Sequence, residues 1–212
     1  MSHKLLSRLI VLSLVLALCL ALVPGCTQSK PKQVLMILSD HSEDIDYMLT
    51  NEAGVMKDML TKAGFKVVTA SDSGQTLGSA STALKPDLKI ADVKVADYAG
   101  LINPCMARDL SVNSSAETLA LIKDAVAQGK VVAAQLGGVA ELYQAGVLAG
   151  KQYAIIADAS GLAPGAIYKG EGVVQDGKII TGGVCPEMAM MAGKKDTTAE
   201  LTQKFIDVLK LQ

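Results

Sequence analysis

The sequence predicts a single α/β domain, a three-layer sandwich in which a mostly parallel sheet lies between two layers of helices. Apolar runs of strand length, such as 34–38 and 131–134, alternate with stretches whose apolar residues recur every three or four positions. This alternation is typical of parallel sheets covered by helices on both faces. The chain has 212 residues, enough for one buried core, and no internal repeat or second domain is visible.

The elements follow one another on short turns. The run 34–38 is apolar throughout, as expected for a central strand covered on both faces. After it we predict a polar loop (39–46), a helix with apolar residues from Met48 to Leu60, a strand (65–70) and an exposed crossover (71–84). A weak strand region (88–95) and a strand (98–102) come next, and the capping-box pair Ser114 and Glu117 then begins a helix that runs to Gln128. The chain continues with strands (131–134 and 153–157), a hairpin (166–180) that turns at Asp176-Gly177, and a last helix (198–209).

The segment 129–150 is the most informative part of the sequence, because it predicts a strand, a tight turn and a helix in direct succession. Its strand, 131–134, leads into Gly137-Gly138, which we expect to permit a sharp reversal, and a helix then runs to Gly146. A strand, a tight turn and a helix form the geometry of a nucleophile elbow, in which a side chain projects above a helix N-terminus that stabilises anions. The elbow residue here is Leu136, and leucine cannot act as a nucleophile.

The N-terminus has the pattern of a secretory signal. Lys4 and Arg8 precede the apolar run 9–23, and Cys26 follows a Val-Pro-Gly sequence. This segment resembles a bacterial lipoprotein signal, in which the cysteine after the cleavage site is lipidated. We therefore predict a signal peptide (1–25), a tether (26–32) and a domain (33–212), with the domain exported and held through Cys26 on the outer face of the bacterial cell membrane or in the cell envelope. An uncleaved membrane anchor is the alternative, although the run is shorter than the roughly 20 residues that span a bilayer.

Composition argues against nucleic acid as a partner. Removing residues 1–25 takes away two of the 20 basic residues, which leaves 18 against 21 acidic ones, and the chain has no Trp. A basic stripe and stacking platforms for bases are both missing. The acidic loop around His41 has no specific ligand spacing, and no glycine segment has a full phosphate-binding pattern, so we expect neither a metal nor a cofactor.

Four segments, in their order and spacing, resemble the ThiJ/PfpI family of the class I glutamine-amidotransferase-like superfamily. They are VLMILSD with its acidic loop, ADYAGLINPC, GKVVAAQLGGVAELYQAGVLAGK and DGKIITGG. The resemblance spans about 33–209 and implies a flavodoxin-like fold. It also implies that the family's nucleophilic cysteine falls on Leu136, and that the acid which tunes this cysteine falls on Asp46.

Two further family positions also differ in this chain. Where many members have a histidine, the sequence has Ala157-Asp158, and the Gly-Gly pair that supplies an anion-stabilising N–H is replaced by Pro104-Cys105. Pro104 has no N–H, although Cys105 could donate its own. Family activities of the protease, deglycase or glyoxalase type are therefore not expected by the usual route.

Cys105 and Cys185 leave three possibilities open. Cys105 could be a relocated nucleophile whose pKa is lowered by Asp46 or His41; the two cysteines could form a disulfide; or both could be buried and inert. We expect Asp46, Cys105, Leu136, Gly137 and Cys185 to surround the pocket. The favoured hypothesis is a membrane-anchored, non-catalytic protein that binds a small molecule or a protein. The alternatives are a Cys105 and Asp46 enzyme, or a structural homodimer, since the family often pairs through its first helix.

Overall fold

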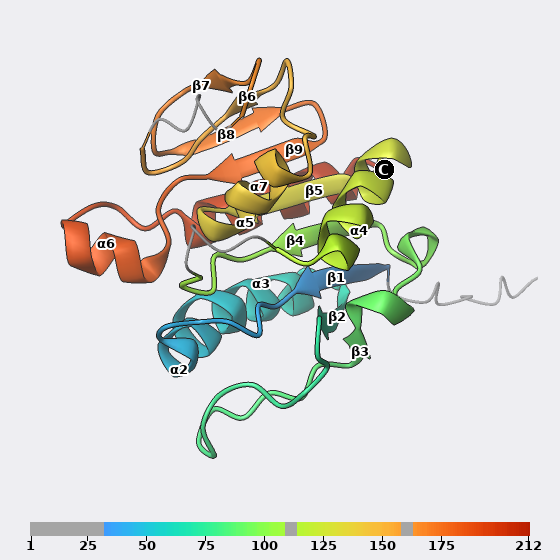
Figure 1. Ribbon diagram of the computed structural model, residues 1–212, viewed down its shortest axis with the longest axis vertical. Helices are drawn as coiled ribbons and strands as arrows, with labels where there is room; N and C mark the ends of the chain where they lie inside the picture. Colours follow the sequence, from blue (N-terminus) through green and yellow to red (C-terminus); the bar gives the residue numbers. More distant parts are fainter. Residues whose placement is uncertain (1–31, 109–113, 158–162) are drawn as a thin grey trace, which may run out of the picture. The chain divides into compact units, whose positions relative to one another are not determined.

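The computed structural model describes residues 32–108, 114–157 and 163–212. They form one compact unit around a seven-stranded sheet with the order β3-β2-β1-β4-β5-β9-β8 (Figure 1). The predicted signal segment, Cys26 and Asp158 lie outside the described residues. Among the residues that are described, no helix is long and apolar enough to cross a membrane.

The centre of the sheet is parallel, as predicted. β1 (Gln33–Ile37) lies between β2 (Lys66–Ser71) and β4 (Gly100–Asn103), and β5 (Val131–Gln135) lies between β4 and β9 (Ile179–Gly182). β8 (Val173–Asp176) pairs with β9 in the antiparallel direction, and Gly177 in the turn has φ 61°. The hairpin predicted at Asp176-Gly177 is therefore confirmed.

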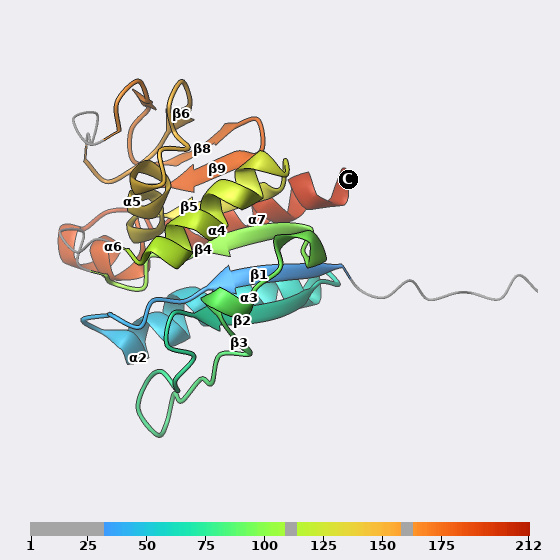
Figure 2. The same ribbon diagram turned by 45° about the vertical axis from the view of Figure 1, so that its right-hand side comes forward.

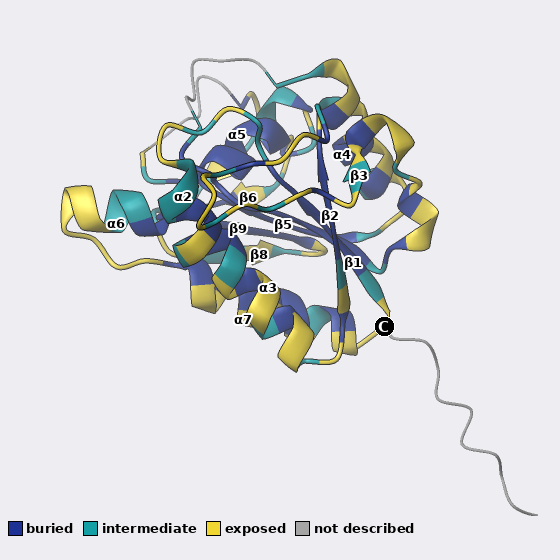
Figure 3. Cartoon of the chain, turned by 90° about the horizontal axis from the view of Figure 1, so that it is seen from below, coloured by how far each residue is buried: buried dark blue, intermediate teal, exposed yellow. Residues whose placement is uncertain are grey.

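Helices cover both faces of the sheet (Figures 2 and 3). α4 (Ala116–Ala127) and α5 (Gly137–Gln144) pack on one face, and α3 (Gly54–Lys62) and α7 (Thr198–Lys210) pack on the other. Each helix buries one apolar stripe, for example Leu201, Phe205 and Leu209 of α7. The three-layer, flavodoxin-like α/β fold is thus the one that the sequence predicts.

Several predicted elements differ in detail. The run 153–157 is not a strand of the main sheet, because only β6 (Gln152–Tyr153) is extended and it pairs with β7 (Ile167–Tyr168) in a separate small sheet. The region 88–95 holds the short β3 (Leu88–Lys89) and then a 3₁₀ turn (Ile90–Asp92), and a second 3₁₀ turn, Val95–Asp97, follows. An additional helix, α6 (Pro186–Ala192), comes before α7. The N-cap of α4 is Ser115 rather than Ser114, since the Ser115 hydroxyl accepts from the Thr118 N–H at 3.0 Å.

The first helical segment contains a turn of π-helix. α2 (Ile45–Met48) passes into the π-helix Leu49–Ala53 and then into α3 without a break. A π-turn is often found at functional sites, because it shifts the direction of the side chains that it carries. The residue of interest on this turn is Glu52, which is fully buried.

Candidate functional site

The elbow predicted at the end of β5 is present, and its backbone is strained at Leu136 rather than reversed at Gly137-Gly138. Leu136 has φ 37° and ψ −90°, α5 begins at the next residue, and the Leu136 N–H donates to the Gly182 carbonyl at 2.9 Å. A positive φ is unfavourable for a residue with a branched side chain, so surrounding contacts must hold this conformation. The side chain that occupies the elbow is nevertheless an alkyl group, and it is 4% exposed.

Gly137 and Gly138 serve close packing, while the reversal itself occurs at Leu136. A Cβ atom on Gly138 would lie 2.2 Å from the Asn103 carbonyl oxygen, and one on Gly137 would lie 2.7 Å from the Cys105 carbonyl oxygen. Neither glycine has a positive φ. The two glycines therefore allow the start of α5 to lie directly against the chain that leaves β4.

Cys105 and Cys185 lie together beneath the elbow. Cys105 follows β4 and is 2% exposed, and Cys185 is the fully buried N-cap residue of α6. Both thiols are free. The neighbouring Cys185 thiol, and after it burial, raises the pKa of Cys105 well above its usual value, although the Gly137 N–H and the Arg108 charge act in the opposite direction. The expectation that Asp46 or His41 lowers the pKa of this thiol is therefore wrong.

Asp46 has a different partner. Its Oδ1 accepts from the Ser79 N–H at 2.6 Å and from the Thr82 hydroxyl. Both bonds lower the pKa of the carboxyl group, and the bond from Thr82 has the larger effect. Asp46 thus holds the crossover segment that follows β2. The acid that the resemblance places next to the elbow does not take that role here.

The carboxylate that reaches the Cys105 loop belongs to Glu52. Its Oε1 accepts from the Cys105 N–H at 2.9 Å, and its Oε2 accepts from the Met106 N–H at 2.8 Å. The pKa of Glu52 is raised well above its usual value, mainly by burial and to a smaller extent by the neighbouring Cys105. The Cys105 N–H, expected to be able to stabilise a substrate anion, is therefore already engaged by this side chain. Met106 and Ala107, which follow, have φ 55° and 46°.

Glu52 was missed at the sequence level, although a signal for it exists. It falls on the same helix face as Leu49, Ala53 and Met56, all of which are buried. A carboxylate at an apolar position of a helix must find hydrogen-bond donors inside the protein, because an unpaired buried charge is costly. That argument identifies Glu52 as a residue with an internal partner, but the partner itself is visible only in the fold.

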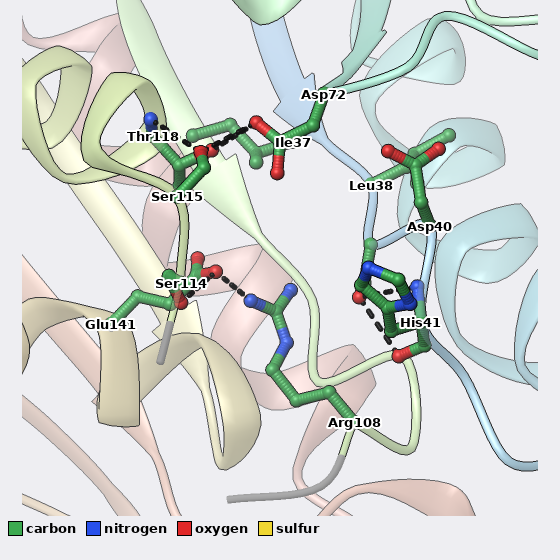
Figure 4. Close-up of a pocket in the computed structure, with 11 residues that line it drawn as sticks. Ile37, Leu38, Asp40, His41, Asp72, Arg108, Ser114, Ser115, Thr118 and Glu141 are labelled. Carbon is green, nitrogen blue, oxygen red and sulfur yellow. Dashed lines mark hydrogen bonds and ion pairs between the residues drawn. The ribbon is translucent and has the colours of Figure 1, made fainter. Parts of the chain in front are cut away.

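A cleft of about 230 Å³ opens next to this cluster, at the carboxyl end of the sheet (Figure 4). The chain runs from β1 to β2 on one side and returns to β4 on the other, and ligands of open α/β sheets bind where the strand order reverses in this way. The cleft is lined by Ile37, Leu38, Ser39, Asp40, His41, Asp72, Arg108, Ser114, Ser115, Thr118 and Glu141. The predicted pocket residues Asp46, Cys105, Leu136, Gly137 and Cys185 do not line it.

One wall of the cleft is a buried ion pair between Arg108 and Glu141, whose side chains are 9% and 5% exposed. The other two guanidinium nitrogens also have partners, since Nε donates to the Cys105 carbonyl at 3.0 Å and Nη2 to the Pro104 carbonyl at 3.3 Å. Glu141 accepts in addition from the Ser114 hydroxyl at 2.7 Å and from the Asn103 amide at 2.5 Å. Arg108 is thereby held by the protein and has little capacity left for an anionic ligand.

The opposite side of the cleft is acidic. Asp72 Oδ1 accepts from the hydroxyls of Ser115 at 2.7 Å and Thr118 at 3.0 Å, at the N-terminus of α4. Asp40 accepts from the Ser73 N–H and hydroxyl at 2.8 and 2.7 Å. Within the described residues, no group of three or more His, Cys, Asp or Glu side chains is placed to hold a metal ion. Carboxylate and hydroxyl oxygens are the polar groups on this side of the cleft.

Comparison with known structures identifies the fold. The chain is similar to a ThiJ/PfpI domain protein from Brachyspira murdochii, with a TM-score of 0.69, 17% identity and coverage of 87% of this chain and 99% of the other. It is also similar to DJ-1beta from Drosophila melanogaster, with a TM-score of 0.57, 22% identity and coverage of 84% and 97%.

Sequence comparison identifies the family. An uncharacterized protein of Archaeoglobus fulgidus is 32% identical over 139 residues, which cover 64% of this chain and 82% of the relative. Residues 32–194 match the DJ-1/PfpI family, and this stretch contains the π-turn, the elbow and the cleft. The chain belongs to the DJ-1/PfpI family.

Proposed function

We propose that this protein is a non-catalytic DJ-1/PfpI binding protein, exported and anchored through a lipidated Cys26, which holds a small polar ligand in the cleft beside the elbow. The observation that carries the proposal is Leu136 at the strained elbow. The backbone that would present a nucleophile is retained, but the side chain has no group that can attack a substrate.

The remaining thiols do not replace the missing nucleophile. Cys105 and Cys185 are both buried, and the thiol of Cys105 has a raised pKa, so the reactive thiolate form is disfavoured at neutral pH. Glu52 occupies the Cys105 N–H that could otherwise stabilise a developing anion. These observations argue against the alternative enzyme that uses Cys105 with Asp46.

The lining of the cleft supports a ligand that donates hydrogen bonds. Asp40, Asp72 and Glu141 contribute three carboxylates, and Arg108 compensates only one of them. A bound amine or a polyhydroxylated molecule would gain from these acceptors, whereas a carboxylate would be repelled. We therefore propose a small amine or amino sugar as the class of ligand.

A matched set of sugars tests this proposal. Glucosamine, glucose and glucuronate share one ring and differ in charge, so their effects on melting temperature should fall in that order. Asp72→Asn should weaken the glucosamine response, while Asp58→Asn, at an exposed position of α3, should leave it unchanged. Equal responses to all three sugars, or turnover of a family-type substrate such as methylglyoxal by the wild-type protein, would contradict the proposal.

A further inference from the structure

We propose that Cys105 and Cys185 form a reversible disulfide that ties the loop after β4 to the N-terminus of α6. The sheet brings the two residues together. Asn103, the last residue of β4, is in register with Ala134 of β5, and the next residue of β5, Gln135, is in register with Gly182 of β9. The chains leaving β4 and β9 therefore both pass the end of β5, and each carries one of the two cysteines there.

Contacts at the end of β5 support bond formation. A Cβ atom on Gly137 would lie 2.7 Å from the Cys105 carbonyl oxygen, and the Gln135 side-chain amide donates to the carbonyl of Val184, the residue before Cys185, at 2.6 Å. Both cysteines therefore lie next to residues 135–137, and a disulfide requires their sulfur atoms to approach to about 2.05 Å. Glu52 accepts from the N–H of Cys105, and Cys185 is the residue at which α6 begins. Cys105 and Cys185 are the two cysteines among the described residues, and both are free and buried.

The reaction is a thiol–disulfide exchange with a small disulfide, such as oxidised glutathione. One cysteine thiolate attacks a sulfur of the oxidant, which forms a mixed disulfide and releases one glutathione thiolate. The second cysteine then attacks the mixed disulfide, the Cys105–Cys185 bond forms, and the second glutathione leaves. The two protons lost by the cysteines go to the released thiolates, and two electrons pass to the oxidant. Because both thiols are buried, the exchange takes place during folding or local opening.

The expected consequence is a redox-dependent stability. The bond would close a loop of the 79 residues between the cysteines, and cross-links of this size stabilise a fold mainly by restricting the unfolded chain. For a domain of this size, we expect the melting temperature of the oxidised form to exceed that of the reduced form by about 5–15 °C. This inference does not depend on the ligand proposed for the cleft.

The test uses the chain from Thr27, which keeps every described element and lacks Cys19 and Cys26. It is refolded from guanidinium in a glutathione redox buffer and digested with trypsin without reductant. We expect peptide 95–108 linked to peptide 179–194, at the sum of their masses less two hydrogens. Dithiothreitol should separate the peptides and lower the melting temperature of the intact protein.

Cys105→Ala and Cys185→Ala are the controls. Each is compared with and without dithiothreitol, so a general loss of stability in a variant does not affect the result. Neither should show the reductant-dependent shift. Two thiols that remain alkylatable after oxidative refolding and denaturation, or a disulfide only between two chains, would overturn the proposal.

Discussion

Glu52 and Cys105 are joined by a hydrogen bond from the Cys105 N–H to the buried Oε1 of Glu52, at 2.9 Å. The second oxygen of the same carboxyl group accepts from the Met106 N–H. Together these bonds fix the loop that leaves β4 in a conformation with two consecutive positive φ values, at Met106 and Ala107. The π-turn that carries Glu52 thus shapes the loop between the elbow and the cleft.

Replacing Glu52 should change both stability and its dependence on pH. The folded-state pKa of Glu52 is raised, so its contribution to stability is fully present below the unfolded pKa, near 4.5, and is lost as pH rises through the folded value. Glu52→Gln should cost about 1–3 kcal/mol at pH 5, because an amide cannot accept both bonds, and less at pH 8. Urea unfolding at several pH values measures this. Glu117→Gln, at an exposed position of α4, is the control, and an unaltered pH profile in Glu52→Gln would refute the assignment.

Asp46→Asn should behave in the opposite way with pH. The pKa of Asp46 is lowered by the Thr82 hydroxyl and the Ser79 N–H, so its contribution is present above the unfolded pKa, near 3.8, and is lost as pH falls through the folded value. The variant should melt at a lower temperature than wild type at pH 6, and the difference should shrink in acid. Cys105 should stay unlabelled by iodoacetamide in the folded variant, as in wild type. A difference in melting temperature that does not shrink in acid would contradict the assigned role of Asp46.

Gly138→Ala should be strongly destabilising, because its Cβ would lie 2.2 Å from the Asn103 carbonyl oxygen, which belongs to the backbone of β4. We expect a loss of about 3 kcal/mol in urea unfolding, at the upper end for overpacking. Gly172→Ala is the matched control, since its Cβ would meet no atom within 4 Å and its φ is not positive. Similar effects of both substitutions would show that the elbow can move away from β4.

Breaking the Arg108–Glu141 pair should also destabilise the fold. Glu141→Gln leaves a buried guanidinium without its counter-charge, at a cost of about 3 kcal/mol. Arg108→Met combined with Glu141→Leu should lose less stability than the sum of the two single changes, because neither charge is then left alone.

Glu200→Gln is the control. It breaks an ion pair with Lys195 in which the side chains are 82% and 50% exposed, and it should cost under about 0.5 kcal/mol. Additive losses at positions 108 and 141 would contradict a coupled pair.

The order of the main elements was predictable because each central strand is apolar on both faces and each helix has a clear stripe. The run 153–157 was misjudged, since an apolar run does not reveal whether a neighbouring strand is available to pair with it. Leu136 was recognised as the elbow from local sequence alone. The cleft was not, because Asp72, Arg108 and Glu141 come from three separate parts of the chain and meet only in the folded sheet.

The claim of lost thiol catalysis is tested most directly by a brief iodoacetamide pulse at pH 7 on the chain from Thr27, in the presence of reductant, with labelling read by mass spectrometry. The account predicts that neither Cys105 nor Cys185 is labelled in the folded protein and that both are labelled after unfolding. Rapid labelling of Cys105 in the folded protein, lost in Cys105→Ser, would contradict it and establish a reactive thiol beside the elbow.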